Sequence, residues 1–232
     1  MKLSGRAFGR VSILSRPEHG DSGEDRWATC PGAGRWALCD GASSSWDAAG
    51  WAAELASALA RKGPCPEAIE RARQRYSRRC ESPEDWLSAL SRRRGSWSTA
   101  LVAEFGALGL SLTLSAIGDT EGLVLDGYGI VLAFPLVSAG DFTDRPALVG
   151  EAGQGALSFH RIQVPLAGLR RPSVVLATDA LAQRILAEPT ATRPALLGFL
   201  DRADDAAFRA WAEAEIDTGK LAPDDLSLVW VR

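Results

Sequence analysis

The hydrophobic positions of this chain change their spacing several times, and each change predicts a different kind of element. Apolar residues alternate or run together over 6–14, 27–30 and 35–39, which is typical of strands. The segment 31–34, Pro-Gly-Ala-Gly, separates the last two and predicts a β-hairpin, because its glycines readily adopt positive φ. The two arms have similar lengths, so we expect the residues just before and just after the hairpin to share one edge.

A helical spacing follows. Ala48, Ala52, Leu55 and Leu59 fall on one helical face, and Gly63-Pro64 ends that helix. We expect the helix N-cap to be one of the serines at 43–45. A second helix is predicted over 66–79. A third is predicted to begin at Ser82-Pro83-Glu84-Asp85, a capping-box pattern, and to end at Arg92-Arg93-Arg94-Gly95.

The rest of the chain returns to strands before it closes with helices and a last strand. Gly-containing turns divide the part from 97 to 134 and predict an antiparallel meander. An aperiodic stretch over 135–155 is predicted to be a loop. The predicted strands are 99–105, 110–117, 122–125, 130–134, 156–164, 173–178 and 226–231, and the predicted late helices are 181–187, part of 190–202, and 204–216.

This order lacks the strict β-α-β alternation of a parallel doubly wound sheet. It favours an α+β fold in layers, with antiparallel sheets packed together and helices covering them. At 232 residues the chain is long enough to bury a substantial core, and we interpret 1–232 as one domain.

The composition of the chain excludes several classes of function. The 46% hydrophobic and 24% charged content is ordinary for a globular protein, and a net charge of −3 gives no footprint for nucleic acid. No run approaches the roughly 18 apolar residues of a membrane span. The N-terminus lacks a secretory apolar core, so we expect a cytoplasmic protein. Four cysteines without Cys-x-x-Cys spacing, and only two histidines, predict free thiols rather than a zinc site.

Acidic residues stand at the ends of the predicted elements. Asp40 and Asp179 each follow a strand, and Asp224 precedes one; Asp119 occupies a turn, and Glu24-Asp25 precedes the hairpin. Carboxylates at the tips of buried strands are costly to desolvate unless a positive charge neutralises them. Oxygen ligands of this kind suit Mg²⁺ or Mn²⁺, and two such ions can activate water for attack on a phosphoryl group. No triad or phosphate-loop motif is visible.

Six short motifs occur in order: Glu24-Asp25, Asp40-Gly41, Ser98-Thr99-Ala100, Gly118-Asp119, Thr178-Asp179 and Asp224-Asp225. This series resembles the metal-dependent protein phosphatase family, type 2C, and in particular its compact bacterial members. The resemblance covers about residues 10 to 232. It implies a four-layer α-β-β-α sandwich, in which helices flank two central antiparallel sheets, with a binuclear Mg²⁺/Mn²⁺ site at one end.

The resemblance also implies roles for individual residues. Asp40 would bridge the two ions and Gly41 would offer its carbonyl oxygen, while Asp179 and Asp224 would be further ligands. Glu24 and Asp25 would hold the metal-bound water that attacks phosphate on Ser or Thr. Asp119 would either hold a third ion weakly or be structural.

The chain departs from the family pattern at Trp97 and Ala180, each of which replaces a motif glycine, and at three further places. Ala42 stands where many members have a histidine that protonates the leaving oxygen, and Gln183 stands where a third-metal acid is usual. The phosphate-binding arginine that usually precedes the Glu-Asp pair is missing, and Arg16 and His19 are the nearest substitutes.

Our leading hypothesis is a metal-dependent phosphoprotein Ser/Thr phosphatase of bacterial signalling that acts on a phosphorylated protein, either a Ser/Thr kinase or its target. The alternative is a catalytically weak, phosphatase-like interaction domain that binds a phosphoprotein or kinase. A hydrolase of a small phosphate ester is a third possibility. Arginines over 71–94 form either a solvated helix face or a docking surface for an acidic or phosphorylated partner.

Overall fold

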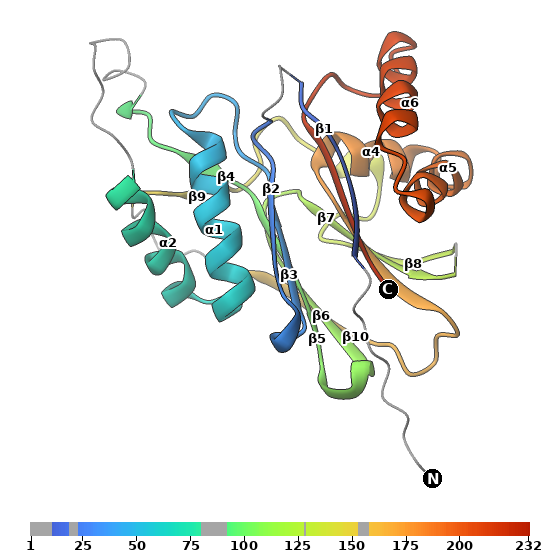
Figure 1. The fold of residues 1–232 in the computed structure, drawn as a ribbon, viewed down its shortest axis with the longest axis horizontal. Helices are drawn as coiled ribbons and strands as arrows, with labels where there is room; N and C mark the ends of the chain where they lie inside the picture. Colours follow the sequence, from blue (N-terminus) through green and yellow to red (C-terminus); the bar gives the residue numbers. More distant parts are fainter. Residues whose placement is uncertain (1–10, 19–22, 80–91, 128, 153–157) are drawn as a thin grey trace.

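Two five-stranded antiparallel sheets face each other at the centre of the molecule (Figure 1). The computed structural model describes residues 11–18, 23–79, 92–127, 129–152 and 158–232. One sheet has the order β1-β12-β11-β7-β8, and its strands are β1 Val11–Arg16, β12 Leu226–Val231, β11 Pro172–Ala177, β7 Glu121–Asp126 and β8 Gly129–Phe134. The other has the order β10-β6-β5-β3-β2, and its strands are β10 His160–Pro165, β6 Ser111–Ile117, β5 Ala100–Phe105, β3 Arg35–Cys39 and β2 Arg26–Cys30.

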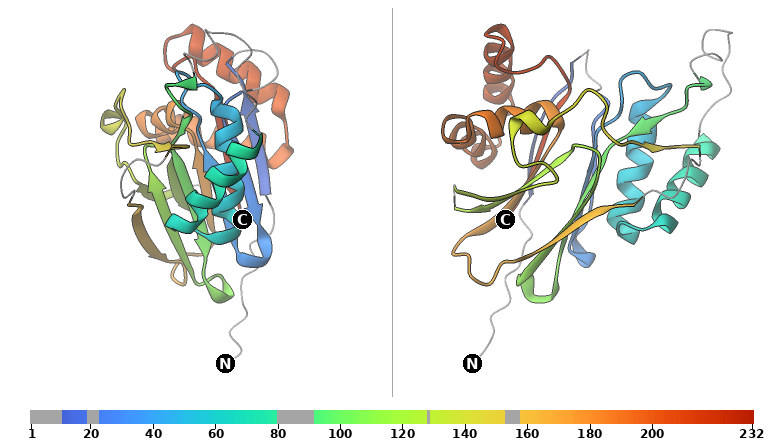
Figure 2. Two further views of the ribbon diagram at one scale, coloured as in Figure 1. Left: turned by 90° about the vertical axis from the view of Figure 1, so that its left-hand side faces the viewer. Right: turned by 180° about the vertical axis from the view of Figure 1, so that it is seen from behind.

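Helices cover the outer faces of both sheets (Figure 2). α1 (Ala48–Lys62) and α2 (Pro66–Arg79) pack on the sheet that contains β3 and β5. α4 (Asp179–Ala187), α5 (Pro189–Arg202) and α6 (Asp205–Asp217) pack on the sheet that contains β1 and β12. The predicted α-β-β-α arrangement of layers is therefore confirmed. No described helix is long and apolar enough to cross a membrane.

The core between the two sheets explains why so many strands are apolar on both faces. Leu114 of β6, Val174 of β11 and Val229 of β12 lie in this central layer and are essentially inaccessible to solvent. The outward-facing side chains of β12 are buried in a second hydrophobic cluster, beneath the helices, so every residue of β12 is buried. Such strands lose the polar alternation that marks a half-exposed sheet.

The meander predicted over 97–134 is wrong in one respect. β5 pairs with β6 and β7 pairs with β8, as expected, but the two pairs belong to different sheets. The chain crosses between the sheets at 118–120. Gly118 has a φ of 90°, and a Cβ there would lie 2.6 Å from Thr99 Cγ2 and 2.7 Å from the Ala147 carbonyl oxygen, so the crossing requires glycine.

Other boundaries also differ from the predictions. The first strand is β1, Val11–Arg16, rather than 6–14. The N-cap of α1 is Asp47, whose side chain accepts a hydrogen bond from Gly50 N at 2.9 Å, and not one of the serines at 43–45. The loop at 135–155 contains β9 (Val149–Gly150), which pairs with β4 (Trp97–Ser98). Most of the helix predicted over 82–94 lies outside the described residues.

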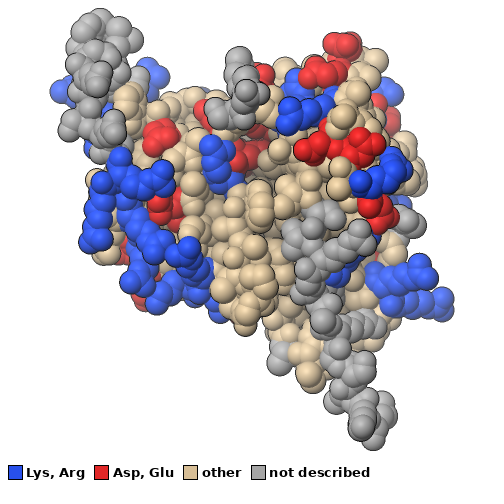
Figure 3. All heavy atoms as spheres, viewed as in Figure 1, with Lys and Arg blue, Asp and Glu red and all other residues tan. Residues whose placement is uncertain are grey.

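Basic side chains gather over α2 and the end of α1 (Figure 3). Two of these arginines have structural partners. Arg73 donates hydrogen bonds to the Gly150 carbonyl at 3.2 Å, and Arg79 forms an ion pair with Glu54 at 2.7 Å. The surface is therefore partly a set of contacts that hold α2 to its neighbours.

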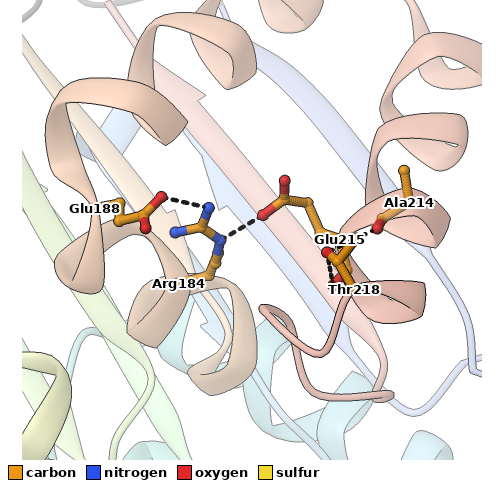
Figure 4. Close-up of polar contacts among 5 residues, drawn as sticks. All are labelled: Arg184, Glu188, Ala214, Glu215 and Thr218. Atoms are coloured by element: carbon orange, nitrogen blue, oxygen red, sulfur yellow. Dashed lines mark hydrogen bonds and ion pairs between the residues drawn. The ribbon is translucent and has the colours of Figure 1, made fainter.

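A buried arginine connects α4 to α6 (Figure 4). The Arg184 side chain is only 6% exposed; its Nε lies 2.6 Å from Glu215 Oε2 and its Nη2 lies 2.8 Å from Glu188 Oε2. Two carboxylates thus neutralise one buried guanidinium, which is the condition under which a buried charge is tolerated.

Candidate metal centre

The aspartates predicted as site residues come from both sheets and meet at one end of the sandwich. In the β2-β3 hairpin Arg26 lies opposite Cys39, so Asp25 and Asp40 occupy neighbouring positions just beyond the paired segment. On the other sheet, Thr178 N donates to the Ser227 carbonyl at 3.1 Å, and Ser227 N donates to Thr178 Oγ1 at 3.0 Å. These bonds align the end of β11, which leads into Asp179, with the start of β12, which Asp224 precedes.

The charges of these residues act on one another. Burial raises the pKa of Asp40 well above its usual value, and the negative charges of Asp25, Asp179, Asp224 and Asp119 raise it further. Five aspartates from distant parts of the sequence therefore lie within electrostatic reach of each other. We call Asp25, Asp40, Asp119, Asp179 and Asp224 the aspartate cluster.

Both carboxylate oxygens of Asp25 are inaccessible to solvent. Burial raises its pKa well above the usual range, and the charges of Asp225, Asp179 and Asp224 add to the rise. The Ser227 hydroxyl opposes the rise in part, but neither oxygen of Asp25 has a hydrogen-bond partner of normal geometry among the described residues. A buried carboxylate without a partner is costly, which points to a positively charged group that belongs there.

Asp119 and Asp224 are perturbed less strongly. Burial and the charge of Asp179 raise the pKa of Asp119 to about 7 and that of Asp224 to about 6. Burial also raises the pKa of Asp179. Within the described part of the chain, no member of the aspartate cluster forms an ion pair with Lys, Arg or His. The cluster is thus a concentration of negative charge for which the described residues provide no compensating side chain.

The donor atoms fit a hard divalent cation, although the side chains do not converge on one point. No group of three or more His, Cys, Asp or Glu side chains among the described residues is placed to hold an ion as it stands. The oxygen-only donor set and the unpartnered oxygens of Asp25 nevertheless match what Mg²⁺ or Mn²⁺ requires.

The backbone around Asp40 is fixed by the strand beside it. The Asp40 carbonyl accepts hydrogen bonds from Thr99 N at 2.9 Å and from Ser98 Oγ at 2.7 Å. Gly41 is bridged to Ser98, and a Cβ on Gly41 would lie 2.9 Å from both Ala48 Cβ and the Glu24 carbonyl oxygen. The sequence motif around Ser98-Thr99 thus serves to position Asp40, and close packing alone already requires the glycine.

Asp225 organises the segment before the hairpin. Its Oδ1 accepts a hydrogen bond from Glu18 N at 2.6 Å, and its Oδ2 accepts one from Glu24 N. Gly23 packs so closely that a Cβ there would lie 2.5 Å from Asp225 Oδ2. Burial raises the pKa of Glu24, whereas a hydrogen bond from Ser43 lowers it. Asp225 and Ser43 therefore help to position the site, a role that the sequence alone did not predict for them.

The two predicted phosphate-binding residues have different outcomes. Arg16 lies near the aspartate cluster, because its Nη1 donates to the Asp224 carbonyl at 3.3 Å, but its Nε is paired with Glu213 of α6 at 2.8 Å. His19 lies outside the described residues. At the position of the missing third-metal acid, the Gln183 amide donates to the Ala139 carbonyl at 3.1 Å and so contacts the loop after β8.

No family model matches this sequence, and no curated protein matches it. Solved structures do match over nearly the whole chain. Serine/threonine phosphatase Stp1 from Staphylococcus aureus has a TM-score of 0.66 at 13% identity, over 98% of this chain and 95% of that chain. PppA, a regulatory component of T6SS in Pseudomonas aeruginosa, has a TM-score of 0.62 at 18% identity, over 98% of both chains.

A third similar structure is the catalytic domain of the phosphatase PstP in complex with two manganese ions. Its TM-score is 0.58 at 16% identity, over 96% of both chains. The chain therefore has the fold of the metal-dependent serine/threonine protein phosphatases, and the resemblance seen in the sequence motifs is confirmed at the level of the fold.

Proposed function

We propose that this protein is a metal-dependent phosphoprotein Ser/Thr phosphatase that uses two Mg²⁺ or Mn²⁺ ions. The observation that carries the proposal is the carboxylate of Asp25, whose oxygens are buried and unpartnered within a cluster of five aspartates that the described residues pair with no cation. Such a cluster is unfavourable in the free protein and becomes favourable when divalent cations bind.

The residues that would hold the ions are Asp40, the Gly41 carbonyl, Asp179 and Asp224, with Asp119 as a further ligand. Two bound divalent cations would supply a nucleophilic water at neutral pH and would neutralise charge on the phosphoryl group. The chain contributes orientation. Thr99 N and Ser98 Oγ fix the Asp40 backbone, and Asp225 fixes the backbone of Glu24 beside Asp25.

Glu24 and Asp25 would accept hydrogen bonds from the attacking water and so orient it toward phosphorus. Ala42 offers no acid for the leaving oxygen, so its proton would come from solvent. The loss of a positioned general acid lowers the rate by roughly 10²–10⁴-fold. We therefore expect slow but measurable turnover, and faster turnover of esters whose leaving oxygen is a weak base.

The test is hydrolysis of p-nitrophenyl phosphate and of Ser- and Thr-phosphopeptides by the full chain with Mn²⁺. We expect turnover that EDTA abolishes, and a loss of about 10³-fold in Asp179→Asn, in line with the removal of one transition-state electrostatic contact. Asp217→Asn is the matched control, because Asp217 lies exposed at the end of α6. We expect it to keep the full rate.

Three results would contradict the proposal. No turnover of any ester or phosphopeptide, together with metal-independent phosphopeptide binding, would favour the interaction domain instead. Equal turnover in Asp179→Asn and in the unaltered protein would remove the aspartate cluster from the reaction. Turnover of small phosphorylated metabolites without turnover of phosphopeptides would change the substrate class.

A further inference from the structure

A second feature lies beside the aspartate cluster: a cavity of about 260 Å³ between the end of β1, the start of β2 and α6. The charged residues that line it are Arg16, Arg26, Arg209, Asp25 and Asp225. Asp25 is its single member from the aspartate cluster. The cavity therefore adjoins the proposed reaction site without coinciding with it.

Three arginines line this cavity, and two of them are engaged by the protein itself. Arg16 is paired with Glu213 and donates to the Asp224 carbonyl. The Nη1 of Arg26 donates to the Gly23 carbonyl at 2.6 Å and to the Asp25 carbonyl at 2.7 Å. For Arg209 the structure shows no hydrogen bond or ion pair with another described residue.

The position of Arg209 on α6 follows from the helix period. Glu213 is four residues further along α6, so the two side chains lie on the same face of the helix. The pairing of Glu213 with Arg16 shows that this face is turned toward the end of β1. The Arg209 side chain is exposed, so a substitution there should leave the fold intact.

Charge and size indicate what the cavity accepts. Of the three guanidinium groups that line it, Arg209 is the one without a described partner, whereas the Asp225 carboxylate already accepts hydrogen bonds from the backbone N–H groups of Glu18 and Glu24. An anionic group that enters from the α6 side would therefore meet a guanidinium that no described residue pairs. The volume lies below the roughly 300–1,000 Å³ of pockets that enclose a whole small ligand, so one side chain is a better fit than a complete molecule.

We propose that Arg209 is a specificity-determining residue, and that this cavity binds an anionic side chain of the substrate next to the phosphorylated residue. The proposal rests on the proposed function. The phosphate that is cleaved would lie at the aspartate cluster, and the neighbouring carboxylate or second phosphate would lie in the cavity. A guanidinium binds both kinds of anion through charge-assisted hydrogen bonds. Figure 3 shows basic and acidic side chains close together beside α6 at this end of the molecule.

The test compares three phosphopeptides of one length: one with alanines beside the phosphoserine, one with glutamates, and one with a second phosphoserine. We expect the Mn²⁺-loaded full chain to show a kcat/KM about fivefold higher for the two acidic peptides. Arg209→Gln should reduce this ratio to about one, and Arg209→Glu should reverse it. Arg71→Gln, on the exposed face of α2, is the matched control and should keep the ratio.

Hydrolysis of p-nitrophenyl phosphate, which has no neighbouring anion, separates this inference from the proposed function. We expect Arg209→Gln to leave it unchanged. If that variant lost p-nitrophenyl phosphate turnover while its thermal unfolding midpoint stayed constant, Arg209 would bind the cleaved phosphate and the inference would be wrong. An unaltered preference in Arg209→Gln would also overturn it. A preference for only one acidic peptide would show whether the cavity selects carboxylate or phosphate.

If no peptide is turned over, the same peptides labelled with a fluorophore give dissociation constants by anisotropy. An acidic preference in binding that Arg209→Gln removes would then support the cavity even though the proposed function had failed. Equal affinities for all three peptides would count against it.

Discussion

Two buried regions of this protein handle charge in opposite ways. At the α4–α6 contact, Arg184 lies between Glu215 and Glu188, and each contact is a short ion pair (Figure 4). In the aspartate cluster, the charges of four aspartates act on Asp40, and the described residues provide no ion-paired cation. In the first region each described charge has a partner of opposite sign, whereas in the second the described residues supply no positive partner. The first arrangement stabilises the fold, and the second is suited to binding a cation.

The largest effect on stability is expected at the α4–α6 contact. Arg184→Met removes the guanidinium and leaves two carboxylates, of which Glu215 is largely buried. Because breaking a buried pair on one side leaves an uncompensated charge, we expect the free energy of unfolding to fall by about 3 kcal/mol. Urea unfolding measures this change. An unchanged midpoint and slope would show that the ion pairs contribute little.

The free energy of unfolding of the metal-free protein should depend on pH because of the aspartate cluster. A carboxyl whose pKa is raised on folding binds more protons in the native state, so its contribution is present at low pH and is lost as the pH rises through the folded value. For Asp119 and Asp224, with folded pKa values of about 7 and about 6, this loss falls between about pH 4 and pH 7.

The metal-free protein should therefore become less stable between pH 5.5 and pH 7.5, by a difference on the order of 2 kcal/mol. Urea unfolding in EDTA at several pH values measures it, and Asp119→Asn should flatten the curve. A metal-free stability that rises over this range would contradict the raised pKa values of the aspartates.

A smaller effect is expected from neutralising one member of the aspartate cluster. Asp40→Asn removes like-charge repulsion at a buried position, so the metal-free variant should be more stable than the unaltered protein, by about 1 kcal/mol. Arg184→Gln is the opposite case and should be less stable under the same conditions. A clear destabilisation by Asp40→Asn would mean that Asp40 has a favourable structural partner.

Much of the fold was predictable because its signals are local. The β2-β3 hairpin follows from two apolar runs around a Gly-rich turn, and α1 follows from its apolar face and the Gly63 stop. The crossing at Gly118 was not predictable in this way. A strand that pairs with its predecessor and a strand that joins the facing sheet have the same local pattern, so only the packed core distinguishes them.

The candidate site shows the same limit. The aspartates were found because each stands at the end of an apolar strand, but their arrangement depends on contacts between segments far apart in sequence. Asp225 holds the backbone of Glu24 from 201 residues away, and Arg209 reaches its cavity because of how α6 packs on β1. Asp47 was missed as an N-cap because three serines precede it and offer the same chemistry.

Calorimetric titration of the metal-free full chain with Mn²⁺ measures whether the aspartate cluster binds divalent cations. We expect two ions per chain, with binding that weakens as the pH falls toward 5 and that is lost in Asp40→Asn but retained in Arg184→Gln. An absence of heat at millimolar Mn²⁺, or the same isotherm in Asp40→Asn and in the unaltered protein, would contradict this expectation.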